Sequence, residues 1–596
     1  MPANLDTFHL ATEPMLKRFK LPLIIIAGLL LALLSLHLIV KVWITPVMEA
    51  LFTESVSYYS SGLYTVTYDD MDVKPLQQKV AFQNFHLAFD SSRVQRTDSL
   101  RLHKWVDLQL DEFEIELENF WTMVPGRYLK VNHLLIENPS LKVYDFSPRH
   151  QPKKLDWQTI SHFDAHQLIR DYFDSLDVNL LSIRDARLNW EKSDRENSFG
   201  LGGINATVRH LRIDSSTVHQ YFGYPRAEQF EVRLRDASFL SPDSLYAFHL
   251  EELVADPVHQ RLSVRGFSME PQKPLYQFAH AVGHQVSRVD LWVEELNFQE
   301  IDLHYLVSEQ AFLVGKIEVK KPEVSVFKDK RLKPPKGTFK PLLQETLHRI
   351  PVAFRLDTLQ LSEGKISYQE HVEEATEAGG IRFDDLYVSG YNITNVDSLW
   401  EKELLMEADI ETRFMEESRL QLALDVPLNS PSSYHRLQGE IREMPLNSVN
   451  NMLENTAFAS IESGHAYTLR FDMRLDEQAS EGDLQFAYRD LKIRLLDKES
   501  SEKGNFKKEL HSLLANWLVV KTNNPDNHRK PLRVGEIRYT RDAEKSIFNY
   551  WWKSLLSGIK GSVGMGDYHS SARNDSEEKE KKGLFKKIFR RDQSDS

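Results

Sequence analysis

Two pairs of histidines have the spacing of a metal site. His162 and His166 are four residues apart, as are His280 and His284, and both pairs fall in segments with helical periodicity. Residues i and i+4 lie on one face of a helix, which suits zinc or copper. The only further ligand near either pair is Asp164, and a chain with 22 histidines contains such pairs by accident. We therefore expect no metal and no other cofactor.

Other signatures of chemistry are missing from the sequence. It contains no H-E-x-x-H, no G-x-S-x-G, no Walker A loop and no dinucleotide fingerprint. There is no cysteine, which excludes disulfides, Cys-bearing zinc sites and cysteine catalysis. The net charge of −13 argues against a nucleic-acid partner, which requires a basic face. We expect a protein that is not an enzyme, although a hydrolase site assembled from distant residues stays open as an alternative.

A transmembrane anchor is predicted at residues 21–43. Its core, Leu21 to Val40, contains one serine and one histidine as its only polar residues. As a helix this core would be about 30 Å long, which is the thickness of a bilayer interior. Three basic residues lie between Lys17 and Lys20, so the positive-inside rule places residues 1–20 in the cytoplasm and the rest of the chain across the membrane. No small-x-small cleavage site follows, which favours an anchor over a signal peptide.

One stretch of alternating residues occurs twice in the chain. Tyr128 to Phe146 and Val314 to Lys330 each contain an apolar strand pattern that runs into a proline and then resumes. Proline sits at strand starts or on edges, so each copy predicts two strands with a corner between them. The two prolines, Pro139 and Pro322, mark the same place in the two copies.

Two further landmarks recur in the same order and at nearly the same interval. The strand pattern that ends at Trp190 resembles the one that ends at Tyr368. The turn Gly202–Ile204 resembles Gly379–Ile381. We interpret these as a tandem duplication of a mostly β unit of about 180 residues. The alternative is that any antiparallel β protein looks self-similar.

Alternation with a period of two dominates the chain from Tyr64 onward and predicts roughly 25 strands. A few short helices cannot cover so many one-faced strands. We expect a mainly β fold, in which an N-terminal transmembrane helix precedes a long, curved, mostly antiparallel β-sheet groove built from repeats. An open apolar trough of this kind would require a ligand such as acyl chains; a closed sandwich without a trough is the alternative. The expected helices are 155–173, 275–286, 341–350, 446–453, 507–519 and 546–559.

The C-terminal third has a different pattern. Residues 439–498 predict a short helix that leads into a glycine-marked pair of strands. Ser546 to Gly561 would form a helix with one aromatic and aliphatic side, suited either to a membrane interface or to packing on the end of the sheet. Residues 567–580 are polar and acidic and are expected to be disordered. The basic tail at 582–591 would form an amphipathic helix on an anionic membrane, or else a solvated tail.

Taken together, these features resemble the AsmA-like family of envelope proteins, which includes TamB. The match lies in the anchor at Leu21 to Val40, the β-rich body after Tyr64, and the segment from Ile441 to Gly561. The resemblance implies a periplasmic β-groove of the bridge-like lipid transfer type, anchored in the inner membrane of a Gram-negative bacterium. It implies passive movement of phospholipids between inner and outer membranes, or assistance to outer-membrane assembly, with an envelope protein as a possible partner. A sheet of about 25 strands would be roughly 120 Å long.

The expected organisation follows from this resemblance. Its parts are a cytoplasmic N-terminus (1–20), the anchor (21–43), a first β-repeat region (60–250), a second (251–430), an AsmA-like C-terminal region with amphipathic helices (431–565), and a disordered acidic linker with a basic amphipathic tail (566–596). The candidate groove-lining residues are Leu129, Val131, Leu141, Val143, Ile317, Val319, Val324, Val326, Phe354, Leu356, Phe471, Met473, Leu491 and Ile493. The candidate membrane-interface residues are Trp551, Trp552, Leu584, Phe585, Ile588 and Phe589. The alternative function is a non-enzymatic envelope scaffold without a lipid conduit.

Overall fold

The fold is mainly β, as the alternation predicts. The computed structural model contains one mixed sheet of 22 strands, against the roughly 25 expected from the pattern. The residues that it describes are 26–35, 37–38, 40–60, 62–90, 104–119, 128–145, 173–192, 199–214, 227–241, 243–302, 305, 311–335, 337–396, 404–496, 520–565 and 567–570.

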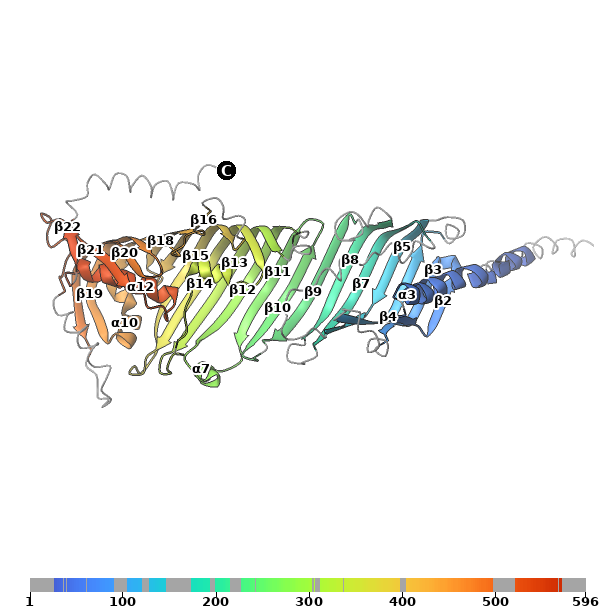
Figure 1. Ribbon diagram of the computed structural model, residues 1–596, viewed down its shortest axis with the longest axis horizontal. Helices are drawn as coiled ribbons and strands as arrows, with labels where there is room; N and C mark the ends of the chain where they lie inside the picture. Colours follow the sequence, from blue (N-terminus) through green and yellow to red (C-terminus); the bar gives the residue numbers. More distant parts are fainter. Residues whose placement is uncertain are drawn as a thin grey trace, which may run out of the picture. The chain divides into compact units, whose positions relative to one another are not determined.

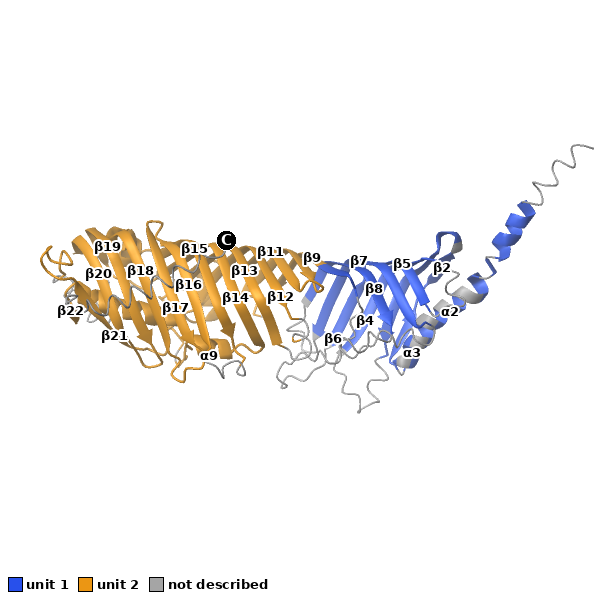
Figure 2. Cartoon of the chain, turned by 90° about the horizontal axis from the view of Figure 1, so that it is seen from above, with its two compact units in different colours: residues 1–152, 159–232 blue, residues 153–158, 233–596 orange. Residues whose placement is uncertain are grey.

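The chain divides into two compact units, which Figure 2 shows in different colours. Unit 1 contains residues 1–152 and 159–232, and unit 2 contains residues 153–158 and 233–596. Each unit is described by itself below.

The described strands of unit 1 pair antiparallel with one another, except that two of them pair parallel with the same third strand (Figure 1). They are β1 Tyr64–Thr67, β2 Asp70–Lys74, β3 Lys79–Phe89, β4 Lys104–Leu117, β5 Tyr128–Glu137, β6 Ser140–Asp145, β7 Ser175–Lys192 and β8 Phe199–Asp214.

Strand β9, Gln229–Leu240, begins in unit 1 and lies mostly in unit 2. From β10 to β21, each described strand pairs with the next along the chain, and all of these pairs are antiparallel except β13 with β14. The remaining strands are β10 Tyr246–Asp256, β11 Arg261–Pro271, β12 Ser287–Ile301, β13 Ala311–Asp329, β14 Ala353–His371, β15 Gly379–Thr394, β16 Leu405–Phe414, β17 Ser418–Pro427, β18 His435–Pro445, β19 Ala459–Leu475, β20 Ala479–Leu495, β21 Arg533–Thr540 and β22 Tyr568–Ser570.

The helices are short and few within the described residues, in agreement with the sequence. Four of the six expected helices are present with shifted ends, as α7, α9, η7 with α10, and α12, while 155–172 and 507–519 lie outside the described residues. Besides the helical residues 26–35, the described helices include η1 Val40–Ile44, α2 Thr45–Glu49, η2 Ala50–Glu54, α3 Ser55–Tyr59, η3 Pro75–Gln77, α7 Gln277–Val282, α9 Leu343–His348, η7 Leu446–Val449, α10 Asn450–Thr456 and α12 Ile547–Ser562.

The predicted anchor is only partly covered by the structure. Residues 26–35 are helical, and their large apolar side chains are exposed, for example Leu31 at 67%. Residues 21–25, 36 and 39 lie outside the described part. Within the described residues, no helix is both long enough and apolar enough to cross a membrane.

The strand topology repeats between the units. In unit 1, β5 and β6 both pair with β4 in antiparallel and with β7 in parallel fashion, and β7 then pairs antiparallel with β8. In unit 2, β13 pairs antiparallel with β12 and parallel with β14, which pairs antiparallel with β15. Non-glycine residues with positive φ occupy matching places in this pattern, at nearly constant intervals along the chain. These pairs are Gln78 with Gln260, Asn138 with Lys321, Asp185 with Glu363 and His210 with Asn392.

Two details of the predicted repeat are wrong. The first copy forms two strands that meet at Asn138 and Pro139, but the second copy is the single strand β13, in which Pro322 pairs with Val293. A residue in the left-handed conformation precedes each proline and accommodates the irregularity there. The strand β13 can therefore continue through Pro322 without being broken into two strands.

The two Gly-Gly-Ile turns are also not equivalent. Ile204 pairs with Ala186, whereas Ile381 pairs with Tyr368 at a different level of the sheet. The counterpart of Gly203 (φ 69) is Asp385 (φ 48), which follows it at the same interval as the other left-handed pairs. Local sequence similarity is a poorer guide than register here, because aspartate tolerates the left-handed conformation that glycine favours.

The left-handed residues keep the apolar side chains of each strand on one face. A strand alternates strictly, so a bulge of one residue moves all later side chains to the opposite face. In β14, the apolar residues Leu359 and Leu361 stand at odd-numbered positions before the bulge at Glu363. After the bulge, the apolar residue Ile366 stands at an even-numbered position. The sequence shifts its apolar positions at the same place, so Ile366 remains on the face of Leu361.

Three apolar clusters form the core of the described residues. One lies in unit 1, with Val80, Phe82 and Leu117 wholly buried. A second lies at the C-terminal end of unit 2, beneath the helices α9, α10 and α12. Between β11 and β15 the third cluster is small, with only Ile301, Val314 and Leu356 fully buried in it.

Candidate functional site

One row of apolar side chains crosses unit 2 from strand to strand. The register connects each residue directly to its neighbour on the next strand, so all of them point to the same face of the sheet. The row is Val264, Leu296, Val319, Leu361, Val388, Ile410, Leu422, Gly439, Phe471 and Leu484.

The exposure of this row changes along its length. From Leu296 on β12 to Leu422 on β17, the apolar side chains are only half-buried. Phe471 and Leu484, on β19 and β20, are 3% and 0% exposed. The row is therefore closed at its C-terminal end and partly open to solvent from β12 to β17, while Val264 at its other end is buried.

The opposite face of these strands is charged. Lys320 of β13 pairs with Glu295 of β12 at 2.8 Å, and Lys365 of β14 pairs with Glu323 at 2.8 Å. These ion pairs are partly exposed, so each adds little stability. They do identify this charged face as the solvated face of the sheet, in contrast to the half-buried apolar face.

The structure brings together six of the predicted lining residues on this face. All of them belong to β13 and β14, and they are half-buried apart from Leu356 at 8% exposure. They are Ile317, Val319, Val324, Val326, Phe354 and Leu356.

The other predicted lining residues lie elsewhere. Leu129, Val131, Leu141 and Val143 belong to the sheet of unit 1, and all but Leu141 are fully buried. Phe471, Met473 and Leu491 are core residues at the closed end of unit 2, while Ile493 is half-buried beside them. The alternation that selected all fourteen residues is the same in an open and in a covered strand.

Helix α12 closes the apolar face over β20 and β21 (Figure 1). Ser546 caps its first turn by accepting a hydrogen bond from the Asn549 amide. A Cβ atom on Gly535 would collide with the carbonyl of Gly558, so the helix and strand approach at backbone distance. Buried hydroxyls complete the contact. Ser480 and Ser554 are 2.7 Å apart, and Ser562 donates to the Leu484 carbonyl at 3.0 Å.

The two tryptophans of α12 have different surroundings. The indole of Trp551 donates a hydrogen bond to Nε2 of His435 at 2.9 Å and packs toward the core. Burial lowers the pKa of His435 to about 4, and the side chain is wholly buried. Trp552 and Phe548 point outward, at 51% and 71% exposure. Trp551 is thus part of the closed end, and only Trp552 remains as a surface residue.

Several predicted features lie outside the described residues or at their C-terminal limit. Leu584, Phe585, Ile588 and Phe589 lie outside the described residues, as do His162 and His166. Residues 568–570, for which the sequence predicts disorder, form β22 and pair with β21. In the part of the chain that the structure describes, no group of three or more potential ligands could bind a metal ion.

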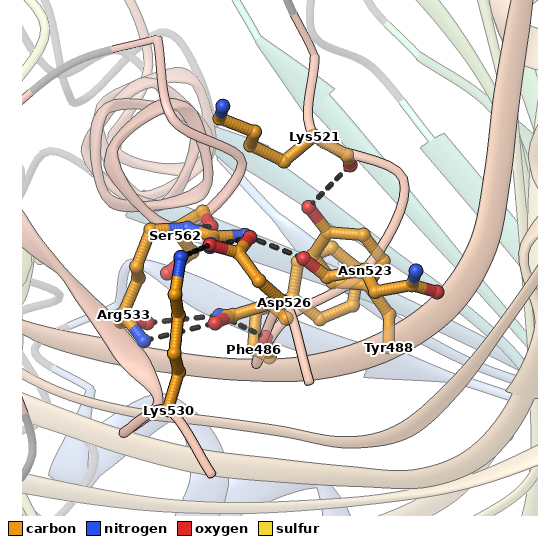
Figure 3. Close-up of polar contacts among 9 residues, drawn as sticks. Phe486, Tyr488, Lys521, Asn523, Asp526, Lys530, Arg533 and Ser562 are labelled. Carbon is orange, nitrogen blue, oxygen red and sulfur yellow. Dashed lines mark hydrogen bonds and ion pairs between the residues drawn. The ribbon is translucent and has the colours of Figure 1, made fainter. Parts of the chain in front are cut away.

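A polar clasp fixes the segment that precedes β21 (Figure 3). Arg533 is 8% exposed, and its guanidinium donates to the carboxylate of Asp526, to the Asn523 carbonyl at 2.6 Å and to the Ser562 carbonyl at 3.1 Å. The hydrogen bond from Arg533, with smaller effects from Lys530 and from the two positive charges, holds the pKa of Asp526 below the usual range. The Ser562 contact joins this segment to the end of α12, so the clasp helps to keep the helix on the sheet.

A neighbouring amide completes the clasp. Asn524, 1% exposed, donates to the carbonyls of Phe486 and Arg533 at 2.7 and 2.9 Å, and Tyr488 donates to the Lys521 carbonyl at 2.8 Å. All of these groups satisfy one another, which is the pattern of a structural element and not of a reactive centre.

Sequence reasoning missed the clasp, and it left the packing of α12 on the sheet as one of two alternatives. The clasp unites residues from 486 to 562, whose proximity no local pattern records. A usable signal for the helix contact existed in the small residues Ser554, Gly558 and Ser562, which recur every four positions along one side of α12.

Comparison with known proteins does not supply an identity. No family model matches the chain, and no curated protein matches it either. A function must therefore be inferred from the amphipathic sheet itself.

Proposed function

We propose that this protein binds phospholipids along the apolar face of unit 2 and moves them passively between two membranes. It would be held at the inner membrane by residues 21–43, with the bulk of the chain in the periplasm, in the manner of the AsmA-like proteins that it resembles. Assistance to outer-membrane assembly through an envelope partner belongs to the same proposal. No residue is assigned a catalytic role.

One observation carries the proposal. The row from Leu296 to Leu422 is apolar on every strand yet only half-buried, while the opposite face of the same strands carries ion pairs. Each Å² of apolar surface left in water forgoes roughly 25 cal/mol, so a long half-open apolar face is costly unless something covers it. Acyl chains suit the face because they are apolar, narrow and indifferent to which aliphatic side chains they touch.

The face also lacks the features of a site for one small molecule. The row from Leu296 to Leu422 is aliphatic on six successive strands and contains no polar side chain. Small-molecule sites place a few polar groups to fix orientation. A continuous aliphatic row instead fits a ligand that slides.

Two neighbouring substitutions on β14 test the proposal. Leu361→Asp places a charge on the apolar face, and Gln360→Asp places the same charge on the opposite, exposed face of the same strand. The full-length chain is purified from membranes with each change, and bound phospholipid per chain is measured by native mass spectrometry with parallel lipid extraction. We expect several lipids per chain in the parent and in Gln360→Asp, and a clear reduction in Leu361→Asp.

Equal lipid content in all three proteins, or none in the parent, would contradict the proposal. Circular dichroism on the same samples shows whether Leu361→Asp has kept its sheet. Since Leu361 is half-exposed, the aspartate can reach water and the fold should persist.

A scaffold is the second candidate function. It is favoured by the closed end of unit 2, where α12 and the clasp hold a rigid surface with Phe548 and Trp552 exposed. A lipid-free parent protein that is stable and monodisperse would favour this alternative.

A further inference from the structure

The apolar face of unit 2 ends at a group of lysines. Beyond Val326 on β13, the next residue on the same face is Lys328, which lies beside Glu370 of β14 in the register. Lys328 is half-buried, and no carboxylate lies within ion-pair distance of it among the described residues. A half-buried ammonium at the end of an aliphatic row requires an explanation, since burial without a partner is unfavourable.

The carboxylate beside Lys328 in the register already has partners. Glu370, 8% exposed, accepts from Nζ of Lys330 at 2.6 Å and from the hydroxyl of Tyr368 at 2.7 Å. Lys330 therefore neutralises the charge of Glu370, and Glu370 does not neutralise Lys328 as well.

Two further lysines come from distant parts of the chain. Lys340 lies in the segment before α9, and its amide donates to the Ala543 carbonyl at 2.8 Å. This hydrogen bond joins the segment to the loop that carries Lys545, just before α12. Both lysines are exposed, and their charges lower the pKa of Lys328.

The balance of charge around Lys328 is positive. Burial lowers its pKa, and Lys330, Lys545 and Lys340 lower it further, against the single opposing effect of Glu370. Four lysines thus act on the end of the apolar face. Lys330 neutralises Glu370, and Glu544 in the loop of Lys545 accepts from the Gly337 amide. Like charges repel one another, and an anion that binds among the lysines offsets this repulsion.

We propose that Lys328, Lys340 and Lys545 bind the phosphate of an anionic amphiphile whose acyl chains lie on the adjacent apolar face. The inference rests on the proposed function and adds a preference for anionic over zwitterionic head groups. Lysine is a suitable phosphate partner because its ammonium is a compact charge that does not demand one geometry. The juxtaposition of this charge with Val326 and Ile366 matches the two halves of a phospholipid.

The test measures the binding of three soluble ligands to the full-length protein, which is held in detergent-free nanodiscs. The ligands are dihexanoylphosphatidic acid, dihexanoylphosphatidylcholine of the same chain length, and inorganic phosphate, and binding is measured by titration calorimetry. The variant is Lys328→Gln with Lys545→Gln. The matched control is Lys320→Gln with Lys365→Gln, which removes two charges from the opposite face of the sheet.

We expect the parent protein and the control to bind phosphatidic acid more tightly than phosphatidylcholine. The variant should lose roughly ten-fold or more in affinity for phosphatidic acid, since contacts to charged groups contribute on this scale. Its affinity for phosphatidylcholine should be unchanged, which would show that the apolar face has remained folded.

The other outcomes separate the two proposals. If the variant binds phosphatidic acid as tightly as the parent, the lysine site is wrong while the lipid-binding face stands. If inorganic phosphate binds as tightly as phosphatidic acid and is lost in the variant, the site takes free phosphate and the head-group assignment is overturned. If the parent binds neither lipid, the proposed function itself fails.

Discussion

Acidification should loosen helix α12 through His435. The native pKa of this histidine is lowered to about 4 by burial, with a smaller contribution in the same direction from Arg541, against 6.5 for an exposed histidine. When α12 opens, the imidazole reaches water and its pKa returns to the higher value. Between these two values the open state binds more protons than the closed state, so the free energy of opening falls as the pH falls from 6.5 to 4 and then levels off.

The magnitude follows from the difference between the two pKa values. When it is fully developed, this difference corresponds to about 3 kcal/mol. Between pH 7 and pH 5 the linkage relation yields a loss of about 2 kcal/mol, which is a change of roughly 20-fold or more in the opening equilibrium. The protonated imidazole would also lose the lone pair with which it accepts from Trp551.

Hydrogen exchange measured by mass spectrometry on the peptide that covers α12 reports this opening directly. The rates at pH 5 and pH 7 are corrected for intrinsic exchange, and His435→Gln is compared with His465→Gln. Glutamine at 435 can still accept from Trp551 but does not titrate, so its α12 should show little dependence on pH over this range. His465 lies on β19 and is partly exposed, and its replacement should leave the dependence intact. An α12 whose protection in the parent protein is the same at both pH values would refute the reasoning.

Further predictions concern the closed end of unit 2 and the apolar face. Gly535→Ala should push α12 away from β21 at a cost of about 1–3 kcal/mol, seen as a lower thermal midpoint by circular dichroism, whereas Gly202→Ala, whose nearest neighbour is 3.8 Å away, should have no effect. Asp526→Asn should destabilise the clasp by about 2 kcal/mol because it leaves the Arg533 guanidinium without its anion, and faster hydrogen exchange in the clasp but not in β14 should reveal it. Replacing Phe548 with serine should leave stability nearly unchanged, since the ring is 71% exposed; a large loss by the same thermal assay would show that the ring is covered.

The repeat illustrates how far local pattern can be trusted. Pro139 and Pro322 are recognisable as a pair from sequence, and the structure places both after a residue in the left-handed conformation. The alternation does not reveal that the strand continues through Pro322, nor that Asp385 is the counterpart of Gly203. These details depend on which residue of a neighbouring strand lies opposite, and register is a property of two strands together.

The amino-acid sequence by itself determined the strand-rich character of this protein, its short helices and the apolar side of each strand. Those properties are set by the period of two and by positions of proline and glycine, which act over a few residues. Only the tertiary structure decided that Val319 and Leu361 are half-buried while Phe471 is closed, because Phe471 belongs to the cluster beneath α9, α10 and α12 at one end of the row. The place of Lys328 beside Glu370 and the joining of the Lys340 segment to the loop of Lys545 were decided in the same way, by strand pairing and by a hydrogen bond between distant segments.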